Sequence, residues 1–595
     1  PSHMVMPAIH KSRQQVATLF QQQTGREVPQ EDVPAQVRLA REELRRAFLE
    51  ADAGMIGANA LIAETGSVML ITNEGNGDLV STLPRTLIVI AGWEKLVPRF
   101  ADVGAQLRLL ARSATGQEIT TYTTFITGPE SLSEGSGPEA GATGETEERR
   151  REVHLVLVDN GRTAMWQDPH FRDALRCIRC AACADVCPPY QVVGGHVFGY
   201  IYSGAIGLVN TPFHHGIDEA AGPQSLCVSC NACATVCPVS IPLPRQILDV
   251  RAKVVETRGM PWYKRATFAV WAHPRLFDVA TRVGAVLQKP VQRGRFLRLP
   301  LPPAWRWRTP PALANGPARD SLIGRTFEPH QTGPWVESAA KGVTAAYFIQ
   351  CLTDRFAPEQ AKAAITLLQA CGVRVEVPAA QHCCGLPSLD AGDKPTAKQM
   401  AKQTIQALEQ SGAAYVVTAA ASCAVAMLHD YPHLLHDEPA WRERAERLAT
   451  KTLDVLSFLE RVARVQDLPV LPATEAEPSV TYHSFCQSTN VLGLGHAGAA
   501  FLRHAGYNVE DLPEGDVCCG FGGSTSIDHP QVARGIAARK LANVGSTGAR
   551  ILVTDNPGCL LHLRGAVDAA AMEVEVKHLV EMLAERVGST RPGPA

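Results

Sequence analysis

Short apolar runs recur along the chain and lead into polar or cysteine-containing segments. TLIVIAG at residues 86–92 and TAAYFIQC at 344–351 have the length of buried strands. The apolar residues of PEQAKAAITLLQAC at 358–371 follow a helical spacing instead. Strands that alternate with helices in this way predict an α/β protein, with the cysteine-bearing loops gathered at strand ends.

A second pattern lies near the start of the chain. The stretch GSVMLITNEGNGDLVSTL at 66–83 alternates apolar and polar residues on both sides of Gly75, Asn76 and Gly77. An Asn-Gly pair between alternating runs is a frequent hairpin turn. We therefore expect two strands joined by a turn at these residues.

The overall composition indicates a multidomain protein in a reducing compartment. At 595 residues the chain is too long for one hydrophobic core, and its hydrophobic fraction of 45% is ordinary. No apolar run approaches the length of a membrane span. Disulfides would be an alternative use for 17 cysteines, but the spacing described below favours metal binding in the cytoplasm.

Two cysteine runs share one spacing, C-x2-C-x2-C-x3-C-P. They are CIRCAACADVCP at 177–188 and CVSCNACATVCP at 227–238. This spacing is typical of bacterial ferredoxins, in which the fourth cysteine of each run binds the other [4Fe–4S] cluster. A zinc site is the rival for one such run, and two complete runs count against it. The predicted ligand sets are Cys177, Cys180, Cys183 and Cys237 for one cluster, and Cys227, Cys230, Cys233 and Cys187 for the other.

The C-terminal half contains a second cysteine pattern, present in two copies. Each copy has a single cysteine, a Cys-Cys-Gly motif 32 residues later and another single cysteine 39 or 40 residues after that. Adjacent cysteines followed by glycine let two thiolates approach one metal centre. The predicted iron ligands are Cys351, Cys383, Cys384 and Cys423 in the first copy, and Cys486, Cys518, Cys519 and Cys559 in the second.

One cysteine remains outside both patterns. Cys371 closes the predicted helix 358–371 and is followed by the apolar stretch GVRVEV. Free cysteine commonly behaves as a small buried hydrophobic residue. We interpret Cys371 as a core residue at a helix end.

These motifs resemble two known families. FIQCLTD, QHCCGLPSLDAG, TYHSFC and DVCCGFGGSTSI, within 345–585, are similar to the CCG domains of heterodisulfide reductase and of iron–sulfur subunits of glycolate and anaerobic glycerol-3-phosphate oxidation. GANALIAETGSVMLITNEGNG, RSATGQEIT, LVDNGR and GGHVFGYIYSGAIG, within 1–260, resemble the lactate-utilisation iron–sulfur subunit with a LUD domain. The chain resembles a fusion of this LUD-domain subunit with a CCG-domain subunit.

The resemblance implies a multidomain α/β architecture with a helical dicluster ferredoxin-like domain. In relatives a substantial stretch precedes the segment that contains PSH, which implies that the LUD-type domain is incomplete before Pro1. The expected divisions are 1–170 for the LUD-type domain, with a flexible loop at about 130–151, 171–250 for the ferredoxin-like domain, 251–343 for a basic, Pro- and Trp-rich linker, 344–475 for CCG repeat 1 and 476–588 for CCG repeat 2.

The sequence departs from heterodisulfide reductase at one position of each repeat. There each repeat ends in C-x2-C, whereas Ala420 and Asn556 take the first of those positions here. The resemblance therefore implies one or two further iron–sulfur clusters in the CCG repeats, without specifying their type.

The implied function is iron–sulfur electron transfer of the lactate-utilisation type. The chain would oxidise L-lactate, a 2-hydroxy acid, to pyruvate or relay its electrons within a complex. The implied partners are another LUD-type subunit or a flavoprotein, with flavin on the partner only. The alternatives are a heterodisulfide-reductase-like thiol–disulfide oxidoreductase and a non-catalytic redox scaffold.

Substrate residues are the least defined part of this interpretation. A 2-hydroxy acid needs a cation for its carboxylate, and a loop system that the resemblance marks as characteristic offers polar groups beside it. The alternative for each candidate residue is an ordinary surface group, and the sequence indicates no general base. The candidates are Glu64, Asn73, Glu74, Arg85, Lys95 and Arg112.

Residues 251–310 are strongly basic. They hold 13 Lys or Arg against Glu256 and Asp278, in a chain whose total charge is −2, and four tryptophans are interleaved. Such a segment fits a peripheral contact with the inner face of a membrane or an acidic partner. A connector that wraps over its own domains is an equal alternative. No nucleic-acid motif accompanies the charge, so no nucleic-acid partner is expected.

Overall fold

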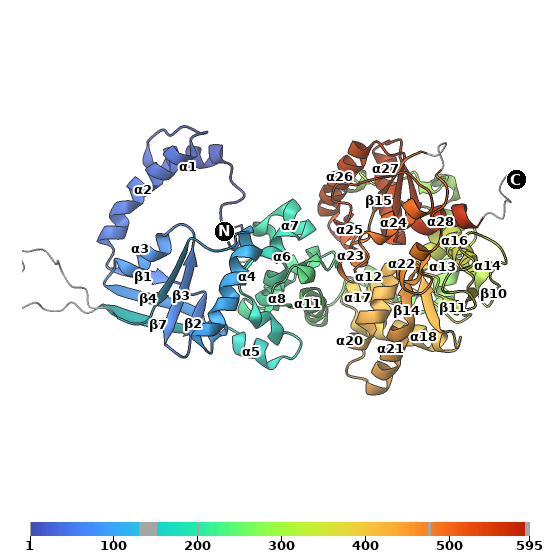
Figure 1. Ribbon diagram of the computed structural model, residues 1–595, viewed down its shortest axis with the longest axis horizontal. Helices are drawn as coiled ribbons and strands as arrows, with labels where there is room; N and C mark the ends of the chain where they lie inside the picture. The colour runs from blue at the N-terminus through green and yellow to red at the C-terminus, as the bar shows by residue number, and fades with distance from the viewer. Residues whose placement is uncertain (1, 130–150, 199–201, 474–477, 589–595) are drawn as a thin grey trace, which may run out of the picture. The chain divides into compact units, whose positions relative to one another are not determined.

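The chain folds into two compact units of mixed α/β structure, which confirms the predicted fold class. The structure is a computed structural model and describes residues 2–129, 151–198, 202–473 and 478–588 (Figure 1). The loop predicted near 130–151 lies outside the described residues, apart from Arg151. Unit 1 comprises Pro1–Tyr190, Gly194–Ala220 and Val236–Gln246, and unit 2 comprises Gln191–Val193, Ala221–Thr235 and Ile247–Ala595.

Unit 1 begins with helices α1 (Arg13–Thr24) and α2 (Val33–Glu50), which are followed by two small sheets, drawn mostly in blue in Figure 1. The parallel sheet has the order β1 (Ala53–Ile56), β4 (Thr86–Gly92) and β7 (Glu152–Val158). The other has the order β5 (Leu96–Val97), β2 (Ala60–Ile62), β3 (Ser67–Thr72) and β6 (Tyr122–Ile126). The expected strand 86–92 is therefore present, and Leu61 packs with Leu87 and Val89 in one apolar cluster that joins the two sheets.

The predicted hairpin at 66–83 is wrong in its second half. After β3 the chain forms helix α3 (Asn76–Thr82), which begins behind Gly75 at a left-handed φ of 72°. Both edges of β3 are already paired, with β2 and β6, so no position beside β3 remains for a hairpin partner. The hydroxyls of Ser81 and Thr82 donate to the Asp78 carbonyl at 3.2 and 2.6 Å, as in a helical turn.

The two ferredoxin-type loops have matching backbones. Left-handed φ angles occur at Arg179 and Ala181 in the first loop and at Ser229 and Asn231 in the second, the same positions of each motif. A short helix follows each loop, α6 (Ala182–Asp185) and α10 (Ala232–Thr235), and the long helix α11 (Leu243–Arg258) comes later. The shared spacing of the cysteines thus produces a shared local fold.

Unit 2 is built from two repeats with the same strand order, which confirms the predicted pair of α/β units. In repeat 1 the order is β10 (Thr326–Phe327), β12 (Arg374–Glu376), β11 (Thr344–Tyr347), β13 (Tyr415–Thr418) and β14 (Thr452–Asp454). In repeat 2 it is β16 (Val509–Glu510), β15 (Val480–His483), β17 (Ile551–Thr554) and β18 (Glu575–His578). All pairings are parallel except that of β10, an additional edge strand.

The repeats share one hydrophobic core. Tyr347 and Leu368 of repeat 1 belong to the same buried cluster as Leu552 and Leu583 of repeat 2. Cys371 is fully buried there, directly after α16, and closes a helix end as predicted. The main helices around the sheets are α16 (Pro358–Ala370), α18 (Lys394–Glu409), α24 (Ala497–His504), α26 (Pro530–Thr547), α27 (Pro557–Ala569) and α28 (Leu579–Val587).

Part of the basic segment 251–343 packs on repeat 1. It contains α12 (Trp262–Ala272) and α13 (Pro274–Leu287), and Phe268 and Phe277 on these helices are buried. Phe277 shares an apolar cluster with Cys351 and Cys383 of repeat 1, so the segment covers its own unit. In the part of the chain that the structure describes, no helix combines the length and the apolar content that crossing a membrane requires.

Candidate iron–sulfur site

The CCG cysteines lie where the strand order of each repeat reverses. Cys351 begins α15 (Cys351–Phe356) after β11, and Cys486 begins α23 (Cys486–Asn490) after β15. Cys423 and Cys559 follow the neighbouring strands β13 and β17. Connections leave these strand pairs in opposite directions, which opens a crevice at their carboxyl ends. The fold therefore brings cysteines that are distant in sequence to one edge of each sheet.

Within repeat 1, four thiols converge. Cys383 donates a hydrogen bond to Cys351 with a sulfur–sulfur distance of 3.6 Å. Cys384 donates to Cys423 at 3.3 Å. All four are buried, and a hydrogen bond between Cys383 and Cys384 joins the two pairs into one shielded donor group.

Repeat 2 repeats this arrangement. Cys519 donates to Cys559 with a sulfur–sulfur distance of 3.2 Å. Cys486 and Cys518 hydrogen-bond to each other, and all four thiols are buried. The second donor group therefore has four buried cysteines at the same motif positions as the first.

The glycine of each Cys-Cys-Gly motif is required by the backbone. Gly385 and Gly520 have φ angles of 84° and 91°, a left-handed conformation that side chains disfavour. A Cβ on Gly520 would lie 2.9 Å from the Ala533 carbonyl oxygen, and one on Gly385 would lie 3.0 Å from the Cβ of Met400. Glycine thus lets each cysteine pair turn closely against a neighbouring helix.

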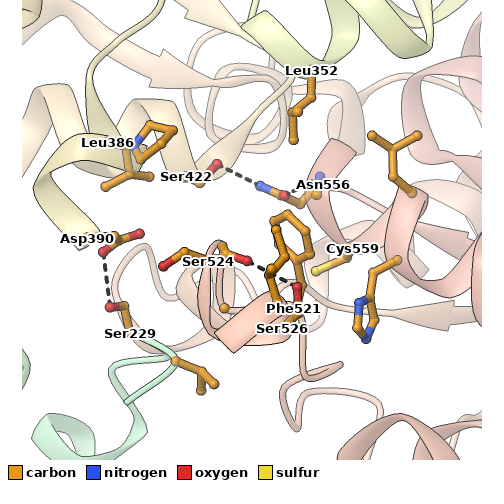
Figure 2. Close-up of a pocket in the computed structure, with 18 of the residues that line it drawn as sticks. Ser229, Leu352, Leu386, Asp390, Ser422, Phe521, Ser524, Ser526, Asn556 and Cys559 are labelled. Carbon is orange, nitrogen blue, oxygen red and sulfur yellow. Dashed lines mark hydrogen bonds between the residues drawn. The ribbon is translucent and has the colours of Figure 1, made fainter. Parts of the chain in front are cut away.

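Both donor groups line the same cavity, whose volume is about 520 Å³. Its walls are largely apolar, with aromatic residues such as Phe268, Trp271 and Phe521. Across it, the Asn556 side-chain amide donates to the Ser422 hydroxyl at 3.1 Å, joining the loops of the two repeats (Figure 2). Asn556 therefore bridges the repeats at a position where heterodisulfide reductase has a cysteine.

The donor chemistry of this cavity fits iron–sulfur clusters. None of the 17 cysteines, all of which lie in the described residues, forms a disulfide, and soft thiolate donors favour iron–sulfur clusters, zinc or Cu(I). A hydrogen bond from Cys519 favours the Cys559 thiolate, yet burial still raises the pKa of Cys559 to about 11. A metal centre compensates buried thiolates that the protein alone would keep protonated.

The second ferredoxin-type loop packs against repeat 2 within unit 2. Cys230 lies close enough to Cys518 to act on its thiol electrostatically, and both belong to one buried cluster. Asn490 donates to the Cys230 carbonyl and Gln487 to the Ser229 carbonyl, each at 2.9 Å. This loop and the CCG thiols are therefore parts of one continuous site.

Arg251 holds the second ferredoxin-type loop in place through hydrogen bonds. The buried guanidinium donates to the Cys227 carbonyl at 3.0 Å and to both oxygens of Gln224. It also donates to the Asp390 carbonyl, and the Ser229 hydroxyl donates to the Asp390 carboxylate at 3.1 Å (Figure 2). Burial raises the pKa of Asp390 to about 6, against the opposing effect of Arg251.

The first ferredoxin-type loop lies in unit 1. Cys177 and Cys237 both act electrostatically on Cys180, so Cys237 lies near this loop, where the ferredoxin pattern requires it. Backbone amides of Arg179 and Ser229 point at the sulfurs of Cys177 and Cys227 at 3.4 and 3.5 Å. Such amides tune the potential of a bound cluster. The complete ligand sets, including Cys187, remain predictions.

Comparison with known proteins supports these assignments at the level of domains. A LUD domain matches residues 2–158, a 4Fe-4S dicluster domain matches 173–241, and a cysteine-rich CCG domain matches 345–428 and 480–564. Lactate utilization protein B of Bacillus velezensis is 45% identical over 260 residues, which are 44% of this chain and 52% of that protein. The protein of that name from Geobacillus thermodenitrificans is 40% identical over 336 residues, 55% of this chain and 67% of the relative. The chain belongs to the lactate utilization protein B family.

The alignments cover only part of this chain and part of each relative. The chain spans about half to two thirds of the length of these lactate utilization B relatives. An Escherichia coli relative, called an uncharacterized electron transport protein YkgF, is 41% identical over 289 residues, 48% of this chain and 58% of that protein. Together with the domain matches, membership of this family indicates iron–sulfur clusters and a redox role.

Among the predicted substrate residues, Lys95 lies beside a ferredoxin-type loop. Burial lowers the pKa of Lys95 to about 8, and the charge of Arg179 lowers it further, while Cys177 opposes the shift. The neighbouring Glu94 forms ion pairs with Arg162 and, at 3.2 Å, with Arg179. In this member of the lactate utilization protein B family, the LUD-type region therefore meets the first cysteine loop through a charged cluster.

The other five candidates contact different partners, so the structure does not bring them together with Lys95. Glu64 accepts from the Phe100 amide at 2.8 Å, and Arg112 is exposed at the end of α4 (Val103–Thr115). The remaining contacts are Asn73 with Gln117 at 3.0 Å, Glu74 with Thr72 at 3.1 Å, and Arg85 with Glu152 at 3.9 Å.

Sequence reasoning missed the buried histidines of the CCG repeats, among them His483. His483 is the last residue of β15, and burial lowers its pKa to about 3, so the ring is neutral. The signal was present, because VTYHSFC places a histidine three residues before Cys486. The spacing of the cysteines alone does not indicate this histidine.

Proposed function

We propose that this chain transfers electrons from a 2-hydroxy acid, most simply L-lactate, through its ferredoxin-type centres to the CCG repeats. The observation that carries the proposal is the contact of the Cys230 loop with Cys518 in unit 2. The printed names of the relatives support lactate as the origin of the electrons.

The cysteine sets give this function its physical basis. Bound iron–sulfur clusters accept and release single electrons. Conversion of lactate to pyruvate releases two electrons and two protons, so electrons must be taken up singly at more than one centre. We assign two [4Fe–4S] clusters to the ferredoxin-type sets and one further iron–sulfur centre to each CCG repeat.

The oxidation step belongs in this proposal to the LUD-type region or to a partner. Lys95 and Arg179 supply cationic groups near Cys177, which suits a carboxylate substrate. A second LUD-type subunit or a flavoprotein is the partner class that would complete the reaction. A soluble dye serves as the electron acceptor in the test.

The proposal is tested with anaerobically reconstituted full chain supplied with L-lactate, D-lactate or no substrate. We expect L-lactate to yield pyruvate in proportion to the dye reduced. Pyruvate formation only after a LUD-type or flavin partner is added would place oxidation on that partner. Cluster reduction by dithionite without any lactate-dependent reaction, partner included, would contradict the proposal.

The shared cavity favours a second candidate function. Thiols of both CCG repeats line one largely apolar cavity, so a disulfide substrate could reach either centre. The heterodisulfide-reductase-like alternative predicts that small disulfides reoxidise the dithionite-reduced chain and are released as two thiols. Unchanged spectra after disulfide addition would count against it. Failure of both reactions would favour the redox scaffold.

We also propose a peripheral contact of α12 and α13 with an anionic surface. Trp262, Leu276, Val279, Val286 and Leu287 are exposed on these helices, within the basic segment. An apolar stripe flanked by cations suits anionic lipid. The chain should float with phosphatidylserine vesicles at low salt and not with phosphatidylcholine vesicles. Protein that stays at the bottom of both gradients would contradict this contact.

A further inference from the structure

The position of His483 connects it to the metal edge of repeat 2. It is the last residue of β15, pairs with Thr554 at the end of β17 and is fully buried. These two strands are the ones that lead into Cys486 and Cys559. The ring therefore stands at the strand ends from which the cysteine ligands emerge.

The hydrogen bond of His483 defines which nitrogen is available. Nδ1 lies 2.8 Å from the Gly515 carbonyl oxygen, which can only accept, so Nδ1 carries the hydrogen. Nε2 then has a lone pair, and it is buried without a hydrogen-bond partner among the described residues. A buried unpaired acceptor is costly unless something binds it.

Two thiols stand next to this ring. A ring nitrogen of His483 and the sulfurs of Cys519 and Cys559 all lie within 4.8 Å of one another. Metal-bound histidines almost always donate their other ring N–H to a carbonyl or carboxylate, as His483 does to Gly515. Imidazole and thiolate together suit iron.

The neighbouring His562 shows the opposite arrangement. Its Nδ1 accepts a hydrogen bond from the Arg308 guanidinium at 2.8 Å. Nε2 of His562 must therefore carry the hydrogen and has no lone pair for a metal. Of these two buried histidines, only His483 is oriented as a ligand.

Repeat 1 has no histidine at the corresponding position. Its buried His382 also has a ring nitrogen, Nδ1, without a hydrogen-bond partner, but among the described residues His382 is not grouped with two thiols as His483 is. Phe348 stands three residues before Cys351, as His483 stands before Cys486, and Phe348 is fully buried. A phenyl ring offers no donor atom, so the two repeats match in their cysteines and differ at this position. We propose that Nε2 of His483 is a ligand of the iron centre in repeat 2, which makes the two CCG centres chemically different.

This proposal rests on the proposed binding of iron by the CCG thiols. A neutral imidazole in place of thiolate raises the potential of an iron–sulfur centre, as it does in Rieske centres. The centre in repeat 2 should therefore have a higher potential than the all-cysteine centre in repeat 1. This order suits the repeat that lies beside the Cys230 loop, because it favours electron uptake there.

The test uses full chain produced with ¹⁴N- or ¹⁵N-labelled histidine, reduced anaerobically and measured by electron spin echo envelope modulation. Wild-type chain should show a histidine nitrogen coupling that changes with the label. In His483→Cys the coupling should vanish while iron and sulfide contents are retained, and the midpoint potential of that centre should fall. The matched variant His562→Gln should keep the coupling.

Each contrary outcome has a distinct meaning. Full iron content without any histidine coupling, or coupling that persists in His483→Cys, would overturn the histidine ligand and leave CCG iron binding intact. Loss of the coupling in His562→Gln alone would move the ligand to His562 and overturn the assignment. Wild-type chain without iron in repeat 2 would overturn this proposal together with the CCG part of the proposed function.

Discussion

Cys518→Ala should remove the iron centre of repeat 2, whereas Cys371→Ala should leave the iron content unchanged. Cys518 hydrogen-bonds with Cys486 and neighbours Cys519 in the second donor group. Loss of one thiolate from a buried cluster site leaves the other ligands without a complete centre. We expect reconstituted Cys518→Ala to lose the iron of one centre, and lactate-dependent reduction of repeat 2 to disappear.

Cys371 is the matched control because it is also a buried cysteine of unit 2. It lies in the apolar core after α16, where burial alone raises its pKa to about 12, and no neighbouring thiol among the described residues acts on it as in the two donor groups. Cys371→Ala should cost about 1 kcal/mol of stability through the small cavity it creates. Iron and sulfide analysis of both variants checks the prediction. Equal iron losses would contradict the assigned roles.

Arg251→Met should detach the second ferredoxin-type loop from the CCG repeats. The guanidinium satisfies the carbonyl oxygens of Gln224, Cys227 and Asp390 inside unit 2. Each buried oxygen left without its donor costs about 1–3 kcal/mol. We expect a stability loss of about 3 kcal/mol or more and much slower reduction of the CCG centres than of the first ferredoxin-type centre.

The control is Arg258→Met, which removes an exposed arginine from the last turn of the same helix. An exposed substitution of this kind changes stability by about 0.5 kcal/mol or less. Denaturant unfolding and stopped-flow absorbance follow both variants. Arg251→Met with wild-type stability and wild-type reduction of the CCG centres would show that the loop needs no such anchor.

Much of the CCG half could be predicted because its apolar runs and cysteines carry independent signals. The runs before Cys351, Cys423, Cys486 and Cys559 are strands, and each cysteine stands just beyond its strand. Period and length suffice to predict such strands, since both faces of a central parallel strand are buried. The same periodicity argument predicted that a helix ends at Cys371.

The errors have a physical origin in tertiary structure. Residues 76–82 alternate like a strand, yet both edges of β3 are occupied by strands that are distant or preceding in sequence. The hydrogen bond from Asn556 to Ser422 joins residues of different repeats, and no local pattern encodes that contact. His483 and the charged cluster around Lys95 likewise depend on which elements the fold brings together.

The most direct test of the relay is an EPR measurement on anaerobic full chain treated with L-lactate, with dithionite or with no reductant. The account predicts that L-lactate, with its LUD-type or flavin partner where required, reduces both the ferredoxin-type and the CCG centres that dithionite reduces. Signals from the ferredoxin-type centres alone after L-lactate, with CCG signals only after dithionite, would contradict electron transfer from the Cys230 loop to Cys518.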